Sequence, residues 1–183
     1  MKIRVLFYKA KWGDKSIVDN LISLWTRSKY SHCEIWIATD EGLFENAYER
    51  FAEGFQYWGT CYTSTMRGDH NGTVKRDACG VLKNPDRWDY IEEEVIAQVY
   101  ATLIIWMNLV VEQNEGYSMW DLLKFLSPVH FPDNNRYICS EFCNDAIWYI
   151  LDNWKGGIIS PKRLHIKLTK LGLETVSLVK RIE

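Results

Sequence analysis

The sequence lacks an excess of charge of either sign. Its 183 residues carry 22 Lys and Arg against 24 Asp and Glu, which gives a formal net charge of −2. Proteins that hold a polyanion use a field of basic side chains, so this balance argues against nucleic acid as a partner. With 47% hydrophobic and 14% aromatic residues, the composition is that of a folded protein. We therefore expect one domain over residues 1–183, long enough to bury a core.

Long apolar runs are also missing. Only four consecutive apolar residues precede Lys9, whereas a secretory signal needs a longer apolar core. The strongest candidate for a membrane segment, residues 95–111, is interrupted by Gln98 and Asn108. It is shorter than the ~20 residues that span a bilayer, so a buried core helix is the better interpretation. We expect a cytoplasmic protein with no signal peptide and no stable membrane insertion.

Spacings typical of metal sites or of a disulfide framework are absent as well. The five cysteines are odd in number and dispersed, and the four histidines are equally scattered. No CxxC pair faces a second CxxC or HxxxH pair, so we expect neither zinc nor another metal, and no cofactor. Without an export signal, the cysteines are most simply free thiols in a reducing compartment.

What the sequence does contain is a succession of strand-like and helix-like segments. Alternating β-forming residues predict strands at 2–8, 31–38, 43–48, 88–92 and 174–182, with strand-like pieces near 57–65 and 73–79. Apolar residues at helical spacing predict helices at 16–25, 93–115, 121–126 and 139–153, and a last one beginning at Ser160-Pro161. The strands gather mostly in the first half and the tail, and the helices mostly in the second half. This distribution predicts an α+β fold.

Cys139 is the first candidate for chemistry. It follows a coil rich in Pro and Asn and begins a helix, so its side chain lies near unpaired N–H groups of the first turn. Those groups and the helix dipole favour a thiolate, and the same N–H groups can receive the oxyanion of a tetrahedral intermediate. Cys143, one turn further along, shares a face with Ile147 and Ile150, which indicates core packing.

A nucleophilic thiol needs a base, and the four histidines differ in their positions. His70 lies in a polar loop and His165 in a late helix, and both are typical of surface residues. His130 lies in a proline-bounded loop near Cys139 in the sequence and stays an alternative. His32 belongs to the strand expected at 31–38, where the backbone holds an imidazole more rigidly than a loop does. On position we favour His32 as the base, with a structural histidine as the competing interpretation.

A third group should fix the orientation and tautomer of the imidazole. Alternation along the 31–38 strand places His32, Glu34 and Trp36 on one face. A turn at 40–42 would return the chain as the 43–48 strand, on which Glu45 is the best-placed carboxylate. Asn46 and Glu34 are the alternatives, and any of them can instead be an ordinary surface residue.

These motifs resemble those of a known family. The order SHCEIWI, FENAYE and YICSEF is similar to the circularly permuted branch of the NlpC-type papain-like cysteine hydrolases, in particular the YiiX-like group. The matching features are Ser31-His32, Glu45 and the residues 137–142, followed downstream by the Ser-Pro element at 159–161. Segments 61–77 and 88–92 resemble bacteriophage members. Glu34 departs from the pattern, because many relatives carry glycine there.

The resemblance implies a single permuted papain-like domain with a central antiparallel sheet packed against helices. It implies a thiol hydrolase in which Cys139 is the nucleophile, His32 the base and Glu45 the orienting group. The substrate would be a peptide-like amide or an acyl ester, and a phage product would act in the host cytoplasm. Glu34 would narrow the cleft or favour a cationic substrate, and Tyr137, Glu34 and Ser140 are further candidates for contacting the substrate or its oxyanion. The competing hypothesis is a catalytically silent binding or virion-associated protein with a protein partner.

Overall fold

The computed structural model describes residues 1–11, 17–38, 58–66, 69–113, 116–117, 137–151 and 156–178. Within these ranges, the strands form one six-stranded antiparallel sheet in the order β4-β3-β2-β1-β5-β6. The strands are β1 (Lys2–Lys9), β2 (Tyr30–Ala38), β3 (Gly59–Thr65), β4 (Gly72–Asp77), β5 (Trp88–Glu94) and β6 (Thr175–Ser177). The helices are α1 (Ile17–Thr26), α3 (Ala78–Val81), the 3-10 turn η2 (Pro85–Arg87), α4 (Ala97–Gln113), α6 (Cys139–Trp148) and α7 (Pro161–Thr169).

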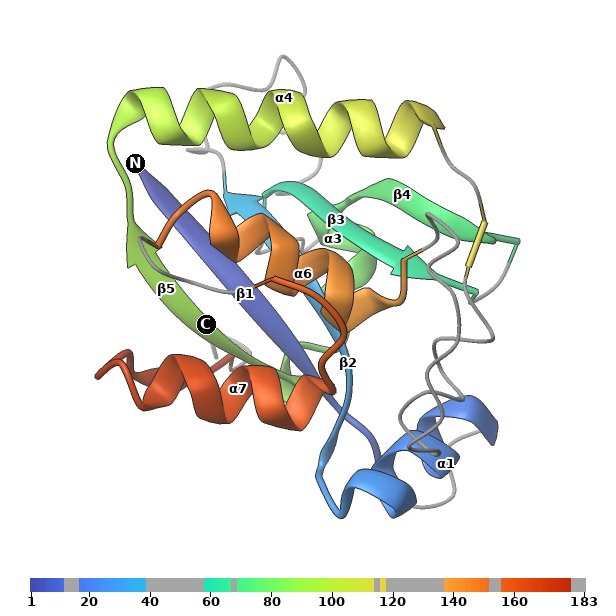
Figure 1. Cartoon of the computed structure of the whole chain (residues 1–183). Coiled ribbons are helices and arrows are strands. Elements are labelled where there is room, and N and C mark those ends of the chain that lie inside the picture. Colours follow the sequence, from blue (N-terminus) through green and yellow to red (C-terminus); the bar gives the residue numbers. More distant parts are fainter. Residues whose placement is uncertain are drawn as a thin grey trace, which may run out of the picture.

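The helices divide between the two faces of the sheet. Figure 1 shows α6 lying across one face, with α4 and α7 on either side of it. Buried residues of these three helices form the main core with β1 and β2, including Phe7, Ile35, Phe142 and Leu164. A smaller core on the other face gathers Leu6, Trp36, Cys61, Leu82 and Trp88 beneath α3. The expected α+β fold with an antiparallel sheet packed against helices is confirmed.

The alternation of β2 decides which side chains face which layer. Cys33, Ile35 and Ile37 belong to the main core under α6, while Trp36 belongs to the smaller core. This agrees with the period-two pattern read from the sequence. The whole strand is buried except at its last residue, because it lies inside the sheet and is covered on both faces.

Three predicted helix features were wrong. The helix expected at 93–115 begins at Ala97, because Glu93 and Glu94 extend β5 and pair with Ile3 and Lys2 of β1. The helix expected at 139–153 ends at Trp148. The segment 95–111 is not buried all round, since Ile105 and Leu109 are exposed on the outer side of α4.

The segments 43–48 and 121–126 and the residue His130 lie outside the described residues. Across the described ranges, no helix has both the length and the apolar content needed to cross a bilayer.

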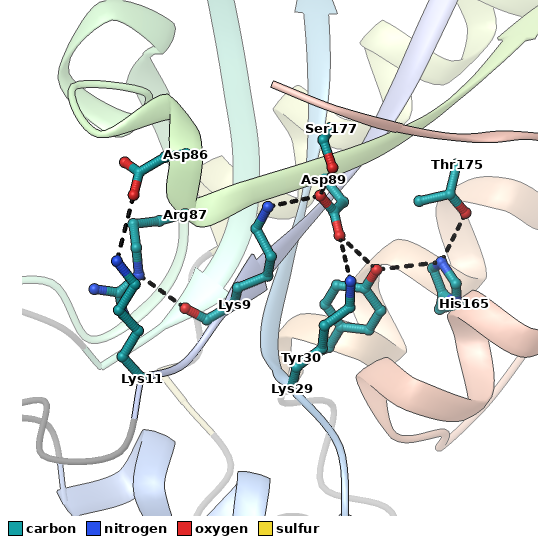
Figure 2. A network of polar contacts seen from close by, with 10 residues as sticks. All are labelled: Lys9, Lys11, Lys29, Tyr30, Asp86, Arg87, Asp89, His165, Thr175 and Ser177. Atoms are coloured by element: carbon teal, nitrogen blue, oxygen red, sulfur yellow. Dashed lines mark hydrogen bonds and ion pairs between the residues drawn. The ribbon is translucent and has the colours of Figure 1, made fainter. Parts of the chain in front are cut away.

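A buried carboxylate joins the strands at one end of the sheet (Figure 2). Asp89 of β5 is 1% exposed, and burial by itself would raise its pKa. Hydrogen bonds outweigh this effect and hold the pKa of the carboxyl well below its usual range. The donors are Lys9 Nζ (2.7 Å), Ser177 Oγ (2.6 Å), Lys29 Nζ (2.9 Å) and Tyr30 OH (2.7 Å). Asp89 therefore ties together β1, β2, β5, β6 and the residue that precedes β2.

His165 extends this network from α7. Its Nε2 lies 2.9 Å from Thr175 Oγ1 and 3.5 Å from the hydroxyl of Tyr30, and its ring packs edge-on against Phe7. The surface position expected for His165 was therefore wrong: the side chain is half-buried between α7 and the sheet. Desolvation, helped by the charge of Lys29, lowers the pKa of its imidazole.

Candidate active site

The helix α6 begins with Cys139, and hydrogen bonds made by residues 137 and 140, on either side of it in the sequence, hold this start in place. Immediately before the helix, the carbonyl of Tyr137 accepts a hydrogen bond from Ser64 Oγ at 2.6 Å. Immediately after Cys139, Ser140 Oγ donates to the carbonyl of Ile159 at 2.5 Å. The N-cap residue, Ile138, has no side chain that can bond the first-turn amides. The N–H groups of this turn are therefore not capped by a side chain and can take up an anionic oxygen.

The place at which α6 begins is set by the parting of two strands. β2 pairs with β3 only from Ile35 to Ala38, although β3 continues to Thr65 in pairing with β4. Beyond this point Thr63 Oγ1 donates to the carbonyl of Cys33 at 2.9 Å, and Ser64 turns to the Tyr137 carbonyl. The first turn of α6 thus docks beside the part of β2 that carries His32.

His32 lies in this gap as an almost fully buried ring, with 4% exposure. Its Nε2 is 3.1 Å from Glu34 Oε1 and 3.4 Å from Thr63 Oγ1. The ring also lies near enough to Cys139 for its charge and hydrogen bonding to lower the pKa of the thiol. The structure therefore brings together Cys139, predicted as nucleophile, and His32, predicted as base.

Among the described residues, Glu34 brings a carboxylate oxygen within hydrogen-bond distance of the imidazole. It is fully buried and contacts both His32 Nε2 and the guanidinium of Arg76 through the same oxygen, Oε1. A carboxylate enclosed in this way cannot meet a cationic substrate, so the expected substrate-facing role of Glu34 was wrong. Glu45, the first choice for the orienting group, lies outside the described residues.

The surroundings of Cys139 do not favour the thiolate expected from its helix position. A hydrogen bond with the Cys33 thiol, together with burial, raises the pKa of the Cys139 thiol well above its usual value. His32 acts in the opposite direction, through its charge and its hydrogen bond. The expectation of a thiolate rested on the first-turn N–H groups and the helix dipole alone. It did not include the burial of Cys139, which is 3% exposed. The thiol of the resting site is therefore neutral unless the imidazole takes its proton.

Two more thiols lie beneath Cys139. Cys33 is hydrogen-bonded to both Cys139 and Cys143, and burial raises the pKa of Cys33 and of Cys143. Cys143 packs in the main core with Phe142 and Ile147, which confirms the core role predicted for it. All five cysteines are free thiols in the structure. Within the described ranges, no three His, Cys, Asp or Glu side chains gather as metal ligands.

The remaining candidates for substrate contact take structural positions. The Tyr137 ring packs edge-on against Trp106 and Phe142, with ring centroids 6.4 and 5.9 Å apart. The Ser140 hydroxyl is fully buried and committed to Ile159, so this residue offers a substrate only its backbone N–H. The ring of Tyr137 is accordingly part of the wall between α4 and α6.

Sequence reasoning missed Arg76, Thr63 and Cys33 as parts of the site. Arg76 pairs with Cys61, which in turn pairs with Trp36, so the three residues form a row across β2, β3 and β4. Because this row lies on the face that also carries Glu34, the guanidinium reaches the carboxylate diagonally. A basic side chain on the core-facing side of a strand could have pointed to Arg76. To pair it with Glu34, however, the register of β2, β3 and β4 must be known, and the sequence alone does not provide it.

No protein-family model matches the chain, and no curated protein matches its sequence significantly. The resemblance to permuted NlpC-type hydrolases therefore rests on the motifs around His32, Glu45 and Cys139. The chemistry of the site has to be argued from its geometry.

Proposed function

We propose that the protein is a thiol hydrolase that cleaves a peptide-like amide or an ester through an acyl-enzyme intermediate. The nucleophile is Cys139, the base is His32, and Glu34 holds the imidazole. The observation that carries the proposal is one buried ring that lies 3.1 Å from a buried carboxylate and lowers the pKa of the thiol at the start of α6. Thiol, imidazole and carboxylate in this order of contact are the components of a nucleophilic triad.

The role of each ring nitrogen follows from the position of Glu34. A carboxylate 3.1 Å from Nε2 favours the tautomer that carries its proton there. Nδ1 is then the unprotonated nitrogen, and we assign it the task of accepting the proton of the Cys139 thiol. Arg76 shares Oε1 of Glu34 and supplies a permanent positive charge beside it. Through this shared oxygen Arg76 holds the carboxylate beside the imidazolium as it forms.

The reaction is acyl transfer to water in two halves. The proton of the Cys139 thiol passes to His32 while the sulfur attacks the carbonyl carbon, and the oxyanion is received by the N–H groups at the start of α6. Collapse of the tetrahedral intermediate breaks the bond to the amine or alcohol, which leaves with the proton from His32. Water then gives a proton to His32 and attacks the thioester, and the carboxylic acid leaves with the free thiol restored.

The test is turnover of a panel of dipeptide amides and acyl esters by five proteins, wild type and the four variants Cys79→Ala, Cys139→Ala, His32→Asn and Cys143→Ala. Wild type and Cys79→Ala, which removes a buried thiol outside the site, should be active. Cys139→Ala and His32→Asn should lose at least about a thousandfold in kcat/KM. Intact-mass spectra of wild type with a slow ester should show one acyl group on Cys139. Turnover that survives in Cys139→Ala, or that is lost only in Cys143→Ala, contradicts the assignment.

One observation favours a second candidate, a binding or virion-associated protein that keeps the fold without the chemistry. Cys139 is nearly inaccessible, and both Cys33 and burial raise the pKa of its thiol. A silent site predicts that iodoacetamide at pH 7 modifies Cys139 no faster than Cys61 or Cys79, and that wild type turns over none of the panel. Selective alkylation of Cys139 together with turnover excludes this candidate.

A further inference from the structure

A pocket of about 450 Å³ opens where the end of α1 meets the first turn of α7. Its apolar wall is made by Trp25, Ile158 and Ile166, whose side chains are between 40% and 58% exposed. Apolar surface of this kind gains free energy when a ligand covers it. The same pocket is lined by two basic residues, Lys162 and Arg163.

The pocket adjoins the start of α6. The segment 157–160 runs along this helix: the Gly157 carbonyl accepts a hydrogen bond from Asn144, and the Ile159 carbonyl accepts one from Ser140. Ile159 lines the pocket, so one hydrogen bond separates the pocket wall from the residue that follows Cys139. On the other side, α1 is tied to β2 by a 2.8 Å hydrogen bond from Ser31 to Asp19. The pocket and the candidate active site are thus built on the same two junctions.

The charge of the pocket is positive and is not neutralised by the described residues that line it. Lys162 Nζ donates to two backbone carbonyls at the end of α1, those of Thr26 at 3.0 Å and Arg27 at 3.3 Å. These neutral acceptors hold the ammonium at the pocket wall without cancelling its charge. The side chain of Arg163 is exposed, and no Asp or Glu is among the described residues that line the pocket. An anion bound here would therefore meet two cations.

We propose that this pocket binds the anionic, partly apolar arm of the substrate, with its carboxylate between Lys162 and Arg163 and its carbon chain on Trp25 and Ile166. The identification of the ligand as substrate rests on the proposed hydrolase function. This preference for an anionic substrate is the opposite of the cationic preference expected from Glu34. The buried carboxylate of Glu34 is enclosed by Arg76 and His32, whereas the exposed charges that line the pocket are basic.

The binding arm of the experiment uses octanoate, which has no scissile bond, and its neutral analogue octanamide. Titration of wild type, followed by ¹H–¹⁵N spectra, should move the amide signals of residues 25–26 and 158–166 with octanoate and much less with octanamide. Arg163→Gln should weaken octanoate binding about twofold to fivefold, as expected for an exposed charge pair, and Arg163→Glu by more. Lys170→Gln removes a charge at the C-terminal end of α7, outside the pocket, and should leave the affinity unchanged.

Equal binding of both probes, shifts located elsewhere, or equal losses in Arg163→Gln and Lys170→Gln would overturn the pocket assignment. The turnover arm compares two p-nitrophenyl esters of suberic acid, one with its far carboxylate free and one with it methylated. Wild type should prefer the free carboxylate, and Arg163→Glu should lose that preference while still hydrolysing the methylated ester. Octanoate binding that depends on Arg163, without hydrolysis of any ester or amide, would leave the pocket standing and refute the hydrolase.

Discussion

Replacing Asp89 by Asn tests whether the buried carboxylate at the end of the sheet holds its strands together. The substitution keeps the size of the side chain and removes its charge. An amide has one oxygen to accept hydrogen bonds, whereas the carboxylate accepts from Lys9 and Ser177 on Oδ1 and from Lys29 and Tyr30 on Oδ2. The amide NH₂ would then face donors on one side and leave them unpaired.

The expected cost is set by the burial of the partners. Removing one member of a fully buried ion pair costs about 3–5 kcal/mol. Here Asp89 is 1% exposed but the side chains of Lys9 and Lys29 are 21% and 59% exposed, so solvent screens the loss. We expect the free energy of unfolding to fall by about 3 kcal/mol. For a chain of this length the melting temperature should then fall by about 10 °C.

Urea unfolding followed by circular dichroism measures this change, and Asp86→Asn is the matched control. Asp86 carries an exposed ion pair with Lys11 at 3.4 Å, so its loss should cost less than about 0.5 kcal/mol. The folded pKa of Asp89 is lowered, so its contribution is complete above the unfolded value of about 4 and is lost as the pH falls through the folded pKa. The gap between wild type and Asp89→Asn should therefore narrow below about pH 4. An Asp89→Asn protein no less stable than Asp86→Asn at pH 7 would refute the reasoning.

Three further predictions concern the site and its surroundings. Glu34→Gln should lower kcat about 10²- to 10⁴-fold because the imidazole loses its orienting charge, and steady-state kinetics showing full activity would contradict the triad. Cys33→Ala should lower the pH midpoint of Cys139 alkylation, measured by mass spectrometry. The reason is that the hydrogen bond with Cys33 is the main cause that raises the pKa of the Cys139 thiol. An unchanged midpoint would contradict this role of Cys33. The pKa of His165 is lowered in the folded protein, so below about pH 6.5 the imidazole binds a proton more readily in the unfolded chain. The free energy of unfolding of wild type should therefore fall from about pH 7 to about pH 5. His165→Gln should flatten this slope in urea titrations, and an identical slope in both proteins would exclude His165 as its source.

The elements that could be predicted from the sequence are those whose signal is local. Period-two alternation located β1 and β2, and the serine and proline at 160–161 located the start of α7, where Ser160 Oγ accepts from the amide of Arg163. The boundary between β5 and α4 was wrong because the pairing of Glu94 with Lys2 is a long-range interaction. Local propensity carries no information about a partner strand so far away in the chain.

The candidate site divides in the same way. Cys139 and His32 could be proposed from the sequence because a helix start and a strand position can be read locally. Glu34 was placed on the correct face and named as an alternative orienting group, but the open, substrate-facing role also expected for it was wrong, because the arginine that encloses it comes from β4, two strands away. The raised pKa of Cys139 likewise depends on Cys33, which reaches it only once α6 lies on the sheet.

The position of β1 has a consequence for the order in which the chain can fold during synthesis. β1 is a central strand that pairs with β2 soon after it in the sequence and with β5 about eighty to ninety residues later. At about 5–20 residues per second, the ribosome needs about 3–11 s to extend the chain from the end of β2 to the end of β5. During that interval one edge of β1 has no partner strand, and such edges recruit other chains. Lys2, Arg4 and Lys9 place three positive charges along this strand, and like charges on nascent copies oppose their pairing until β5 arrives.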